Sequence, residues 1–257
     1  MKLTETNYYS LKNQYISNSK IKAYEDNPYL FYMRYVTGEV PHETTPPLIL
    51  GQAVDTWLTE SKESFINKYI KVDRRSRKSD IPWDNQLTPI VYDTISNICT
   101  SIENSTIYKD MMKRKFISQQ IFQIDKPVGQ FPGLCGKPDW YKIEGDTCTI
   151  VDLKTSATID PTKFYYHCLT FNYFKQQSMY RDLILHHNPK IKHFKHFLLV
   201  TEKSSKYSNN LALFEIPEEY IKQASIELNN SIKKIKLDKF NKPNLTWDNT
   251  TSFVRYR

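Results

Sequence analysis

Glycine is scarce in this sequence, where six glycines are outnumbered by thirteen prolines. No G-x-x-x-x-G-K-[ST] or G-x-G-x-x-G string occurs, which argues against the glycine-rich loops that cradle nucleotide phosphates. The four cysteines form no C-x-x-C pair; they are Cys99, Cys135, Cys148 and Cys168. A zinc or iron–sulfur framework is therefore not expected, and reduced cysteines in an intracellular compartment are the simplest interpretation.

Long apolar runs are absent as well. No stretch of about eighteen apolar residues occurs, so no transmembrane helix is expected. The first twenty residues also lack the apolar run of a secretory leader. We therefore expect a cytoplasmic protein with no membrane partner. The chain has 257 residues, of which 39% are hydrophobic and 25% charged, and this predicts a single packed domain over residues 1–257.

The charge balance is uneven, because 36 lysine and arginine residues exceed 28 aspartate and glutamate residues and leave a formal net charge of +8. A basic surplus favours a polyanionic partner, and nucleic acid is the commonest partner of this kind. Solubility alone would account for the same surplus. Charge therefore points toward nucleic acid without establishing it.

Apolar periodicity divides the chain into three parts. The spacing predicts a helical part over about 1–115, a sheet with helices over about 116–237 and an irregular tail over 238–257. A loop is expected at 71–86, strands at 116–124, 133–143, 147–155, 194–202 and 211–216, and helices at 161–187 and from Pro217, as first residue, to about 237. This order predicts an α/β domain with a central mixed sheet and flanking helices.

Two short strings carry the chemistry, G-K-P-D at 136–139 and I-V-D-L-K-T at 150–155. The turn signal E-G-D at 144–146 is expected to fold the two strands into a hairpin. Asp139 and Asp152 would then lie close together on neighbouring strands. Because residues i and i+2 of a strand share a face, Asp152 and Lys154 would project to the same side.

Two neighbouring carboxylates repel each other unless something neutralises them. Their hard oxygens select Mg²⁺, for which Mn²⁺ would substitute, over zinc. A lysine beside the metal would position an attacking water or neutralise charge on a phosphate. The residues therefore indicate phosphodiester hydrolysis, with Asp139, Asp152 and Lys154 as catalytic residues. A lone D-x-K is more often a structural ion pair, but the hairpin with P-D on its other arm is more specific.

This pattern resembles the signature of the PD-(D/E)xK nucleases, which consists of P-D, a short hairpin and D-x-K. The resemblance implies a restriction-endonuclease-like core. A Q-x-x-x-Y string, Gln176 to Tyr180, narrows it to the RecB-like branch and, within that, to RecE-type (exonuclease VIII-like) phage exonucleases. Both residues face one way on a helix, and in that family the pair lies beside the active site and toward the DNA. The opening at 16–24 and the strand at 197–203 are also similar, so the resemblance covers roughly residues 8–237.

The metal ligands implied by the resemblance depart from the family in two places. The family has G-x-x-x-H where this chain has Gly51 and then Asp55, so Asp55 would replace the histidine as a ligand. The family often has a glutamate on the strand before P-D, but this chain has glutamines there, and Gln119 is a candidate replacement through its carbonyl oxygen. The backbone carbonyl of Leu153 is a further candidate ligand.

The resemblance further implies a magnesium-dependent exonuclease that degrades double-stranded DNA from 5′ to 3′ and leaves a 3′ single-stranded tail. In the family, a single-strand annealing protein pairs that tail with another strand during recombination, and such exonucleases often form homo-oligomeric rings around DNA. By this resemblance the protein would be phage-encoded and act in a bacterial host cell.

Two other features bear on DNA. The R-R-S-R-K run at 74–78 predicts phosphate contacts through Arg74, Arg75 and Arg77, although a solvated loop is an equal alternative. Aromatic residues at 164–166 and 171–174 would suit stacking on unpaired bases, but core packing is favoured at such density. No cysteine or carboxylate has fitting spacing beside the paired histidines at 186–187 and 193–196, and these are not expected to bind a metal.

Two other functions are considered. A CRISPR-adaptation-type nuclease with an iron–sulfur cluster would need a late cysteine cluster, and the last cysteine is Cys168, so this possibility is set aside. A catalytically silent DNA-binding or scaffold protein on the same fold remains the alternative, because of Asp55 and the missing glutamate. Divalent-metal binding would separate it from an enzyme.

Overall fold

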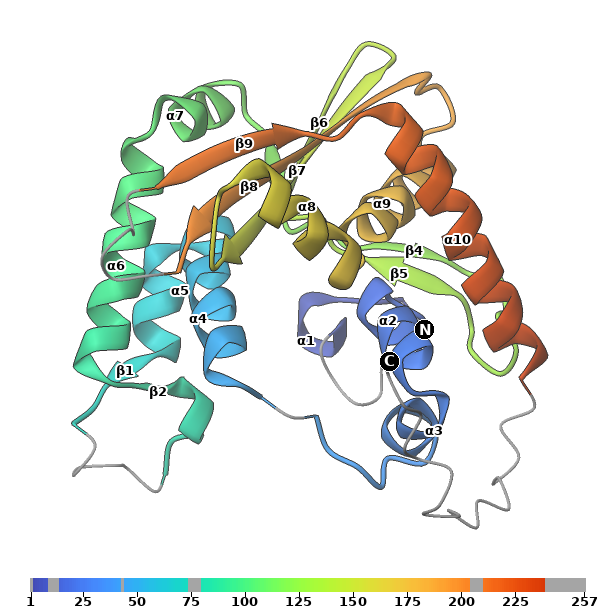
Figure 1. Ribbon diagram of the computed structural model, residues 1–257, viewed down its shortest axis with the longest axis horizontal. Helices are drawn as coiled ribbons and strands as arrows, with labels where there is room; N and C mark the ends of the chain where they lie inside the picture. The colour runs from blue at the N-terminus through green and yellow to red at the C-terminus, as the bar shows by residue number, and fades with distance from the viewer. Residues whose placement is uncertain (1, 9–13, 43, 74–79, 204–209, 239–257) are drawn as a thin grey trace.

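A five-stranded mixed sheet forms the centre of the computed structural model, which describes residues 2–8, 14–42, 44–73, 80–203 and 210–238 (Figure 1). Its strands, in spatial order, are β3 (Ile117–Ser118), β6 (Trp140–Glu144), β7 (Thr147–Ser156), β8 (His193–Glu202) and β9 (Leu211–Glu215). Strands β7 and β8 are parallel, and the other neighbours are antiparallel. The expected α/β class with a mixed sheet is confirmed.

Helices flank this sheet on both sides. The first half of the chain supplies α1 (Glu5–Tyr8), α2 (Asn18–Asp26), α3 (Pro28–Phe31), the π-helix η1 (Tyr32–Val36), α4 (Pro46–Asp55), the π-helix η2 (Thr56–Glu60), α5 (Lys62–Lys68), α6 (Pro89–Asn104) and α7 (Thr106–Lys113). The second half supplies α8 (Pro161–Thr170), α9 (Tyr173–His187) and α10 (Glu218–Leu237). In Figure 1, α4 to α7 lie on the left, α2, α9 and α10 on the right, and α8 in front of the sheet.

Strand β7 contributes to two cores because its side chains alternate between the faces of the sheet. Val151 and Leu153 point into a core shared with α4 and α6. Cys148 and Ile150 point into a second core shared with α9 and α2. The even-numbered positions of β7 therefore face α9, and this periodicity carries Asp152 and Lys154 to the same side.

The predicted hairpin between β6 and β7 is present. Trp140 pairs with Val151 and Glu144 with Thr147, which leaves Gly145 and Asp146 as a two-residue turn. Gly145 has a φ of 63°, in the left-handed region that favours glycine. The turn signal in the sequence thus sets the register that brings Asp139 opposite the centre of β7.

Local signals also set the helix boundaries near the N-terminus. The side chain of Asn27 accepts a hydrogen bond from the Leu30 N–H at 3.0 Å, and Pro28 is the first residue of α3. Asn27 therefore ends α2 and caps α3. For the last helix the prediction was wrong by one position, because Pro217 is the N-cap residue and α10 begins at Glu218.

Two expected strands are each divided in the structure. The segment 116–124 gives β3 and β4 (Phe122–Ile124), and 133–143 gives β5 (Leu134–Gly136) and β6. Gln119 has a φ of 55°, which turns the chain out of β3, and Pro138 has no N–H with which to continue a strand. Strands β4 and β5 pair with each other in a separate two-stranded sheet.

The expected loop and the long helix also need correction. Within 71–86, the described residues include parts of a small parallel pair, β1 (Ile70–Lys71) and β2 (Gln86–Leu87), and the 3-10 helix η3 (Trp83–Asn85). The helix expected at 161–187 is interrupted between α8 and α9, where Asn172 is left-handed with a φ of 58°. The run at 74–79, with Arg74, Arg75 and Arg77, and the tail from 239 lie outside the described residues. Among the helices described, none has the length and apolarity that a membrane span requires.

Candidate active site

Asp152 and Lys154 of the D-x-K string lie in the second half of β7, on the face toward α9. Asp152 is only 1% exposed, and its Oδ2 forms an ion pair with Nζ of Lys154. Apart from this ion pair, Oδ2 of Asp152 has no hydrogen-bond partner within the described chain. A buried carboxylate oxygen with so little hydrogen bonding is costly unless a cation compensates it.

Asp139 precedes β6 and reaches across the hairpin to β7. Its Oδ2 accepts a hydrogen bond from the backbone N–H of Leu153 at 2.6 Å. Its own carbonyl accepts a hydrogen bond from the backbone N–H of Gln119 at 3.1 Å. Asp139 is therefore anchored beside the residue that follows Asp152, which is the proximity that the sequence predicted.

Helix α4 brings Asp55 to the same end of the sheet. A Cβ added at Gly51 would lie 3.2 Å from Oγ1 of Thr155, so glycine lets α4 approach β7 closely. Asp55, one turn later, ends α4. It accepts hydrogen bonds from the Thr59 hydroxyl at 3.1 Å and from Nε2 of Gln119 at 3.2 Å.

Electrostatic effects tie the three aspartates together. Burial raises the pKa of Asp139 well above its usual range, and the charges of Asp152 and Asp55 raise it further. Burial likewise raises the pKa of Asp55 to about 6; the charge of Asp152 adds to this, against the Thr59 hydrogen bond and the charge of Lys137. A place where neighbouring carboxylate charges raise the pKa of Asp139 and of Asp55 is one where a cation would be favoured.

Lys154 begins a chain of hydrogen bonds that runs through the Q-x-x-x-Y string. Its Nζ donates to Oε1 of Gln176 at 2.9 Å, Nε2 of Gln176 donates to the Tyr180 hydroxyl at 2.8 Å, and that hydroxyl donates to the Lys137 carbonyl at 3.2 Å. A Cβ at Gly136 would lie 3.1 Å from the Tyr180 ring and 2.7 Å from Leu183, so glycine is needed for this packing. The chain of hydrogen bonds joins α9 to both β7 and the P-D loop.

The charge state of Lys154 is set by opposing effects. Burial alone would lower its pKa, but the negative charges of Asp152 and Asp139 outweigh burial and raise it. Lys154 is therefore a protonated cation at neutral pH. It can stabilise negative charge and orient a water.

The donor chemistry of these carboxyls fits a hard divalent cation. Within the described residues, no group of three histidine, cysteine, aspartate or glutamate side chains is arranged to hold a metal ion. Yet three carboxyls share this end of the sheet, and Lys154 compensates Oδ2 of Asp152. A cation bound by Asp152 would compete with Lys154 for that oxygen.

The structure brings most of the predicted site residues together and adds others. Asp55, Asp139, Asp152, Leu153, Lys154, Gln176 and Tyr180 are linked by the contacts above. Sequence reasoning missed Thr59, although its position one helical turn after Asp55 was a usable signal. It also missed Tyr173, whose ring centroid lies 4.4 Å from Nζ of Lys154.

Gln119 takes a different orientation from the one expected. Its Nε2, and not its carbonyl oxygen, is directed at Asp55 and at Oγ1 of Thr59, the latter at 2.6 Å. Its Oε1 is buried and has no hydrogen-bond partner in the described part of the chain. A donor is favoured at this position because an amide oxygen facing the Asp55 carboxylate would be repelled.

A mixed sheet with P-D before one strand, D-x-K on the next and Q-x-x-x-Y on the covering helix defines a PD-(D/E)xK-type domain. A family model confirms this class: the chain belongs to the family described as PDDEXK-like domain of unknown function (DUF3799), which matches residues 17–242. This membership supports a nuclease, and it supports dependence on a divalent metal.

One solved structure shows the same fold. A protein of Eubacterium rectale, described as a candidate exonuclease, is similar with a TM-score of 0.67 and 17% identity, over 92% of this chain and 87% of that one. The structure of SSO0001 matches with a TM-score of 0.33 and 15% identity, over 63% of this chain and 68% of that one, too little to argue from. No curated protein matches the sequence.

Proposed function

We propose that this protein is a divalent-metal-dependent deoxyribonuclease that acts as a 5′-to-3′ exonuclease on double-stranded DNA. The observation that carries the proposal is the convergence of Asp139, Asp152 and Lys154 at one end of the sheet, with Lys154 bonded to Gln176. The net charge of +8 suits a polyanionic substrate. The polarity rests on the resemblance to RecE-type exonucleases alone.

Asp139 and Asp152 would hold Mg²⁺ or Mn²⁺, with Asp55 and the carbonyl of Leu153 as further ligands. When bound, the cation supplies Lewis-acid charge and lowers the pKa of a coordinated water. Lys154 would face the phosphate as a cation and neutralise charge that develops there. Gln176 keeps its hydrogen bond to Lys154 and limits the directions in which Nζ can point.

The biological setting belongs to the same proposal. The 3′ single-stranded tail left by such an enzyme would be the substrate of a single-strand annealing protein, in phage-type recombination within a bacterial cytoplasm. A ring of several copies around DNA would make degradation processive. Sedimentation of the protein with and without linear duplex DNA tests the oligomeric ring. Capture of labelled single-stranded tails by an annealing protein tests the second partner.

The direct test uses linear double-stranded DNA labelled at either the 5′ or the 3′ end, with Mg²⁺, Mn²⁺ or EDTA. We expect release of the 5′ label as mononucleotides in Mg²⁺ and no release in EDTA. Release of the 3′ label first would contradict the proposed 5′-to-3′ polarity but would still support a nuclease. If neither label is released with Mg²⁺ or with Mn²⁺, the proposal that the protein is a nuclease is refuted.

A catalytically silent DNA-binding protein is the second candidate. It is favoured by Gln119 at the place of the family's glutamate, and by the lack of a gathered three-ligand group among the described residues. Calorimetric titration with Mg²⁺ and Mn²⁺ separates the two candidates. A silent relative would show no saturable heat of metal binding. An enzyme would show such a heat, and the Asp152→Asn variant would lose it.

A further inference from the structure

Aromatic rings extend outward from Lys154 to the protein surface. The ring of Tyr173 lies against Nζ of Lys154, and the ring of Phe171 stacks on Tyr173 with centroids 5.7 Å apart and an interplanar angle of 26°. Phe171 is 47% exposed, whereas Tyr173 is partly buried. The outer ring of this pair therefore faces solvent one ring away from the candidate catalytic lysine.

Core packing does not account for Phe171. Of the aromatic residues in this region, Phe164 is 2% exposed and packs with Leu198 and Val200 of β8. Phe171 instead closes the turn between α8 and α9, and its other ring contact is the edge of His167 at 6.0 Å. Phe164 thus fills the core, Tyr173 packs against it with ring centroids 6.2 Å apart, and Phe171 is the outer ring stacked on Tyr173.

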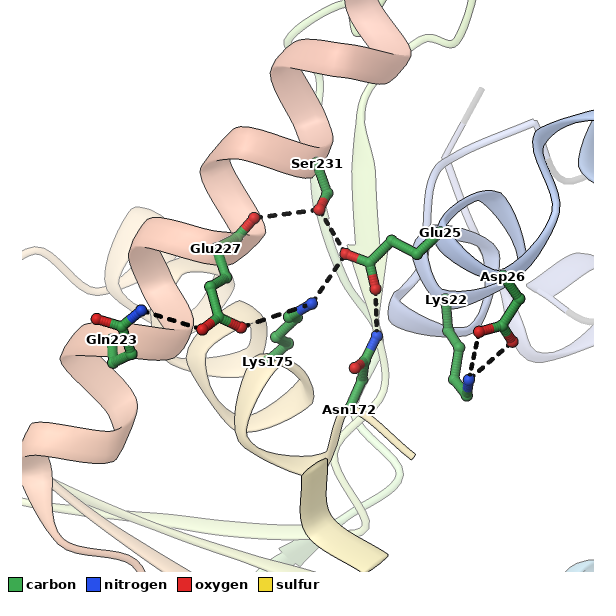
Figure 2. Close-up of polar contacts among 8 residues, drawn as sticks. All are labelled: Lys22, Glu25, Asp26, Asn172, Lys175, Gln223, Glu227 and Ser231. Atoms are coloured by element: carbon green, nitrogen blue, oxygen red, sulfur yellow. Dashed lines mark hydrogen bonds and ion pairs between the residues drawn. The ribbon is translucent and has the colours of Figure 1, made fainter. Parts of the chain in front are cut away.

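Contacts from other helices fix the turn that presents this pair. Asn172, left-handed between Phe171 and Tyr173, donates from Nδ2 to Oε2 of Glu25 on α2 at 2.6 Å (Figure 2). Lys175 donates to the other oxygen of Glu25 at 2.9 Å, and the hydroxyl of Ser231 on α10 also reaches it. Figure 2 shows these groups meeting at Glu25.

The hydrogen bonds of this network favour the ionised form of Glu25. Burial would raise the pKa of Glu25, but hydrogen bonds from Ser231, Lys175 and Asn172 outweigh burial and lower it. An ionised Glu25 accepting several charge-assisted hydrogen bonds holds α2, the turn and α10 in one arrangement. The stacked pair is therefore preorganised, which reduces the entropy that a ligand would lose on stacking there.

We infer that Phe171 and Tyr173 form a stacking platform for an unpaired nucleobase of the DNA strand that is being cut. This inference rests on the proposed function. A phosphate held at Lys154 would place a neighbouring base within reach of rings that adjoin the same lysine. A paired base inside a duplex has both faces covered by its neighbours, so only a base at a frayed end or in a single strand offers a free face.

The platform predicts a substrate preference without sequence specificity. Every base has a π-face, so stacking tolerates any sequence. A frayed or single-stranded end should bind more tightly than a fully paired end, because no stacking has to be broken. The enzyme would thus recognise the open end of a strand through Phe171 and the phosphate through Lys154.

Fluorescence of 2-aminopurine tests the platform, because stacking on an aromatic ring quenches it. The probe is a single-stranded oligonucleotide with 2-aminopurine near its 5′ end, titrated with the full chain in EDTA, so that nothing is cleaved. Phe171→Leu keeps an apolar side chain against Tyr173 but has no π-face, and Phe171→Trp keeps one. We expect quenching by the wild type and by Phe171→Trp, and at least about fivefold weaker binding with little quenching by Phe171→Leu.

Tyr166→Leu is the matched control, because Tyr166 is an exposed ring of α8 that touches neither Phe171 nor Tyr173 in the described contacts. Quenching unchanged in Phe171→Leu, or lost equally in Tyr166→Leu, would overturn the platform. The platform would also be overturned if Phe171→Leu dissociated an oligomer while quenching stayed intact, because Phe171 would then be a contact between copies. Thermal unfolding of each variant shows that the fold is kept.

Cleavage assays separate this inference from the proposed function. If the wild type cleaves and Phe171→Leu raises KM on frayed ends while kcat is kept, both stand. If the wild type cleaves and Phe171→Leu is unchanged in KM and in quenching, only the platform fails. If no variant cleaves in Mg²⁺ or Mn²⁺ but quenching still depends on Phe171, only the nuclease fails.

Discussion

Lys154 donates a hydrogen bond from Nζ to Oε1 of Gln176 at 2.9 Å, across the gap between β7 and α9. Gln176 in turn donates to Tyr180, so the lysine is held by a helix that also contacts the P-D loop. The same lysine pairs with Asp152 on its own strand. Its position is therefore determined from two directions, by strand periodicity and by helix packing.

Replacing Gln176 with alanine should lower kcat for DNA cleavage by about 10- to 100-fold, because Lys154 loses the acceptor that orients it. Tyr180→Phe should have a smaller effect, since Gln176 still accepts from Lys154. Steady-state rates on end-labelled duplex DNA check both. Equal loss in the two variants would mean that the helix contact, and not the orientation of Lys154, matters.

Asp152→Asn should lower the cleavage rate by at least about 100-fold while DNA binding in EDTA stays within a few-fold of wild type. The neutral amide removes a candidate ligand and the charge that holds Lys154. Asp160→Asn is the control, because Asp160 is an exposed N-cap of α8 and asparagine caps equally well. Full activity in Asp152→Asn would refute its catalytic assignment.

The stability of the metal-free protein should depend on Asp55 and pH. Its pKa is raised by burial to about 6 in the folded chain, above the unfolded value of about 3.9. The folded state then binds the proton more tightly, so stability falls as pH rises from about 4 to about 6 and the penalty is full above that.

Asp55→Asn removes this penalty, so without metal it should be more stable than the wild type by on the order of 2 kcal/mol at pH 7 and by little at pH 4. Urea unfolding at the two pH values measures the difference. A difference in stability that does not change between pH 4 and pH 7 would show that the pKa of Asp55 is not raised in the folded protein. Saturating Mg²⁺ should favour the wild type instead.

Gln119→Glu should increase the affinity for a divalent metal and lower the stability of the metal-free protein. The change places a further carboxyl group beside Asp55, and a bound cation would compensate its charge. The shift in Tm on adding Mn²⁺ should be larger than in the wild type. Gln120→Glu, at the exposed neighbour, should leave that shift unchanged, and the same shift in both variants would contradict the expectation.

Gly136→Ala should destabilise the protein by about 1–3 kcal/mol and reduce activity, because the new Cβ would press on Leu183 and the Tyr180 ring. Gly51→Ala should cost less. Its Cβ meets only Oγ1 of Thr155 at 3.2 Å, and alanine is the better helix former within α4. Urea unfolding of both variants checks this order.

The sequence predicted the hairpin that carries Asp139 and Asp152 well because its determinants are local. Gly145 can adopt the left-handed turn, strand periodicity places Asp152 and Lys154 on one face, and helical periodicity aligns Gln176 with Tyr180. Each of these relationships spans only a few residues, so neighbouring backbone geometry is sufficient to fix it. The order of helices and strands followed for the same reason.

Only the tertiary structure decided which distant groups meet at that hairpin. The amide of Gln119 faces Asp55 because a left-handed residue turns the chain there, and Phe171 reaches the surface because Glu25, from the far end of the chain, holds Asn172. The strands at 116–124 and 133–143 divide because their halves pair in different sheets. Packing between segments distant in sequence decides the first two contacts, since Asp55 and Gln119 are 64 residues apart and Glu25 and Asn172 are 147 apart, and a local pattern does not encode such meetings.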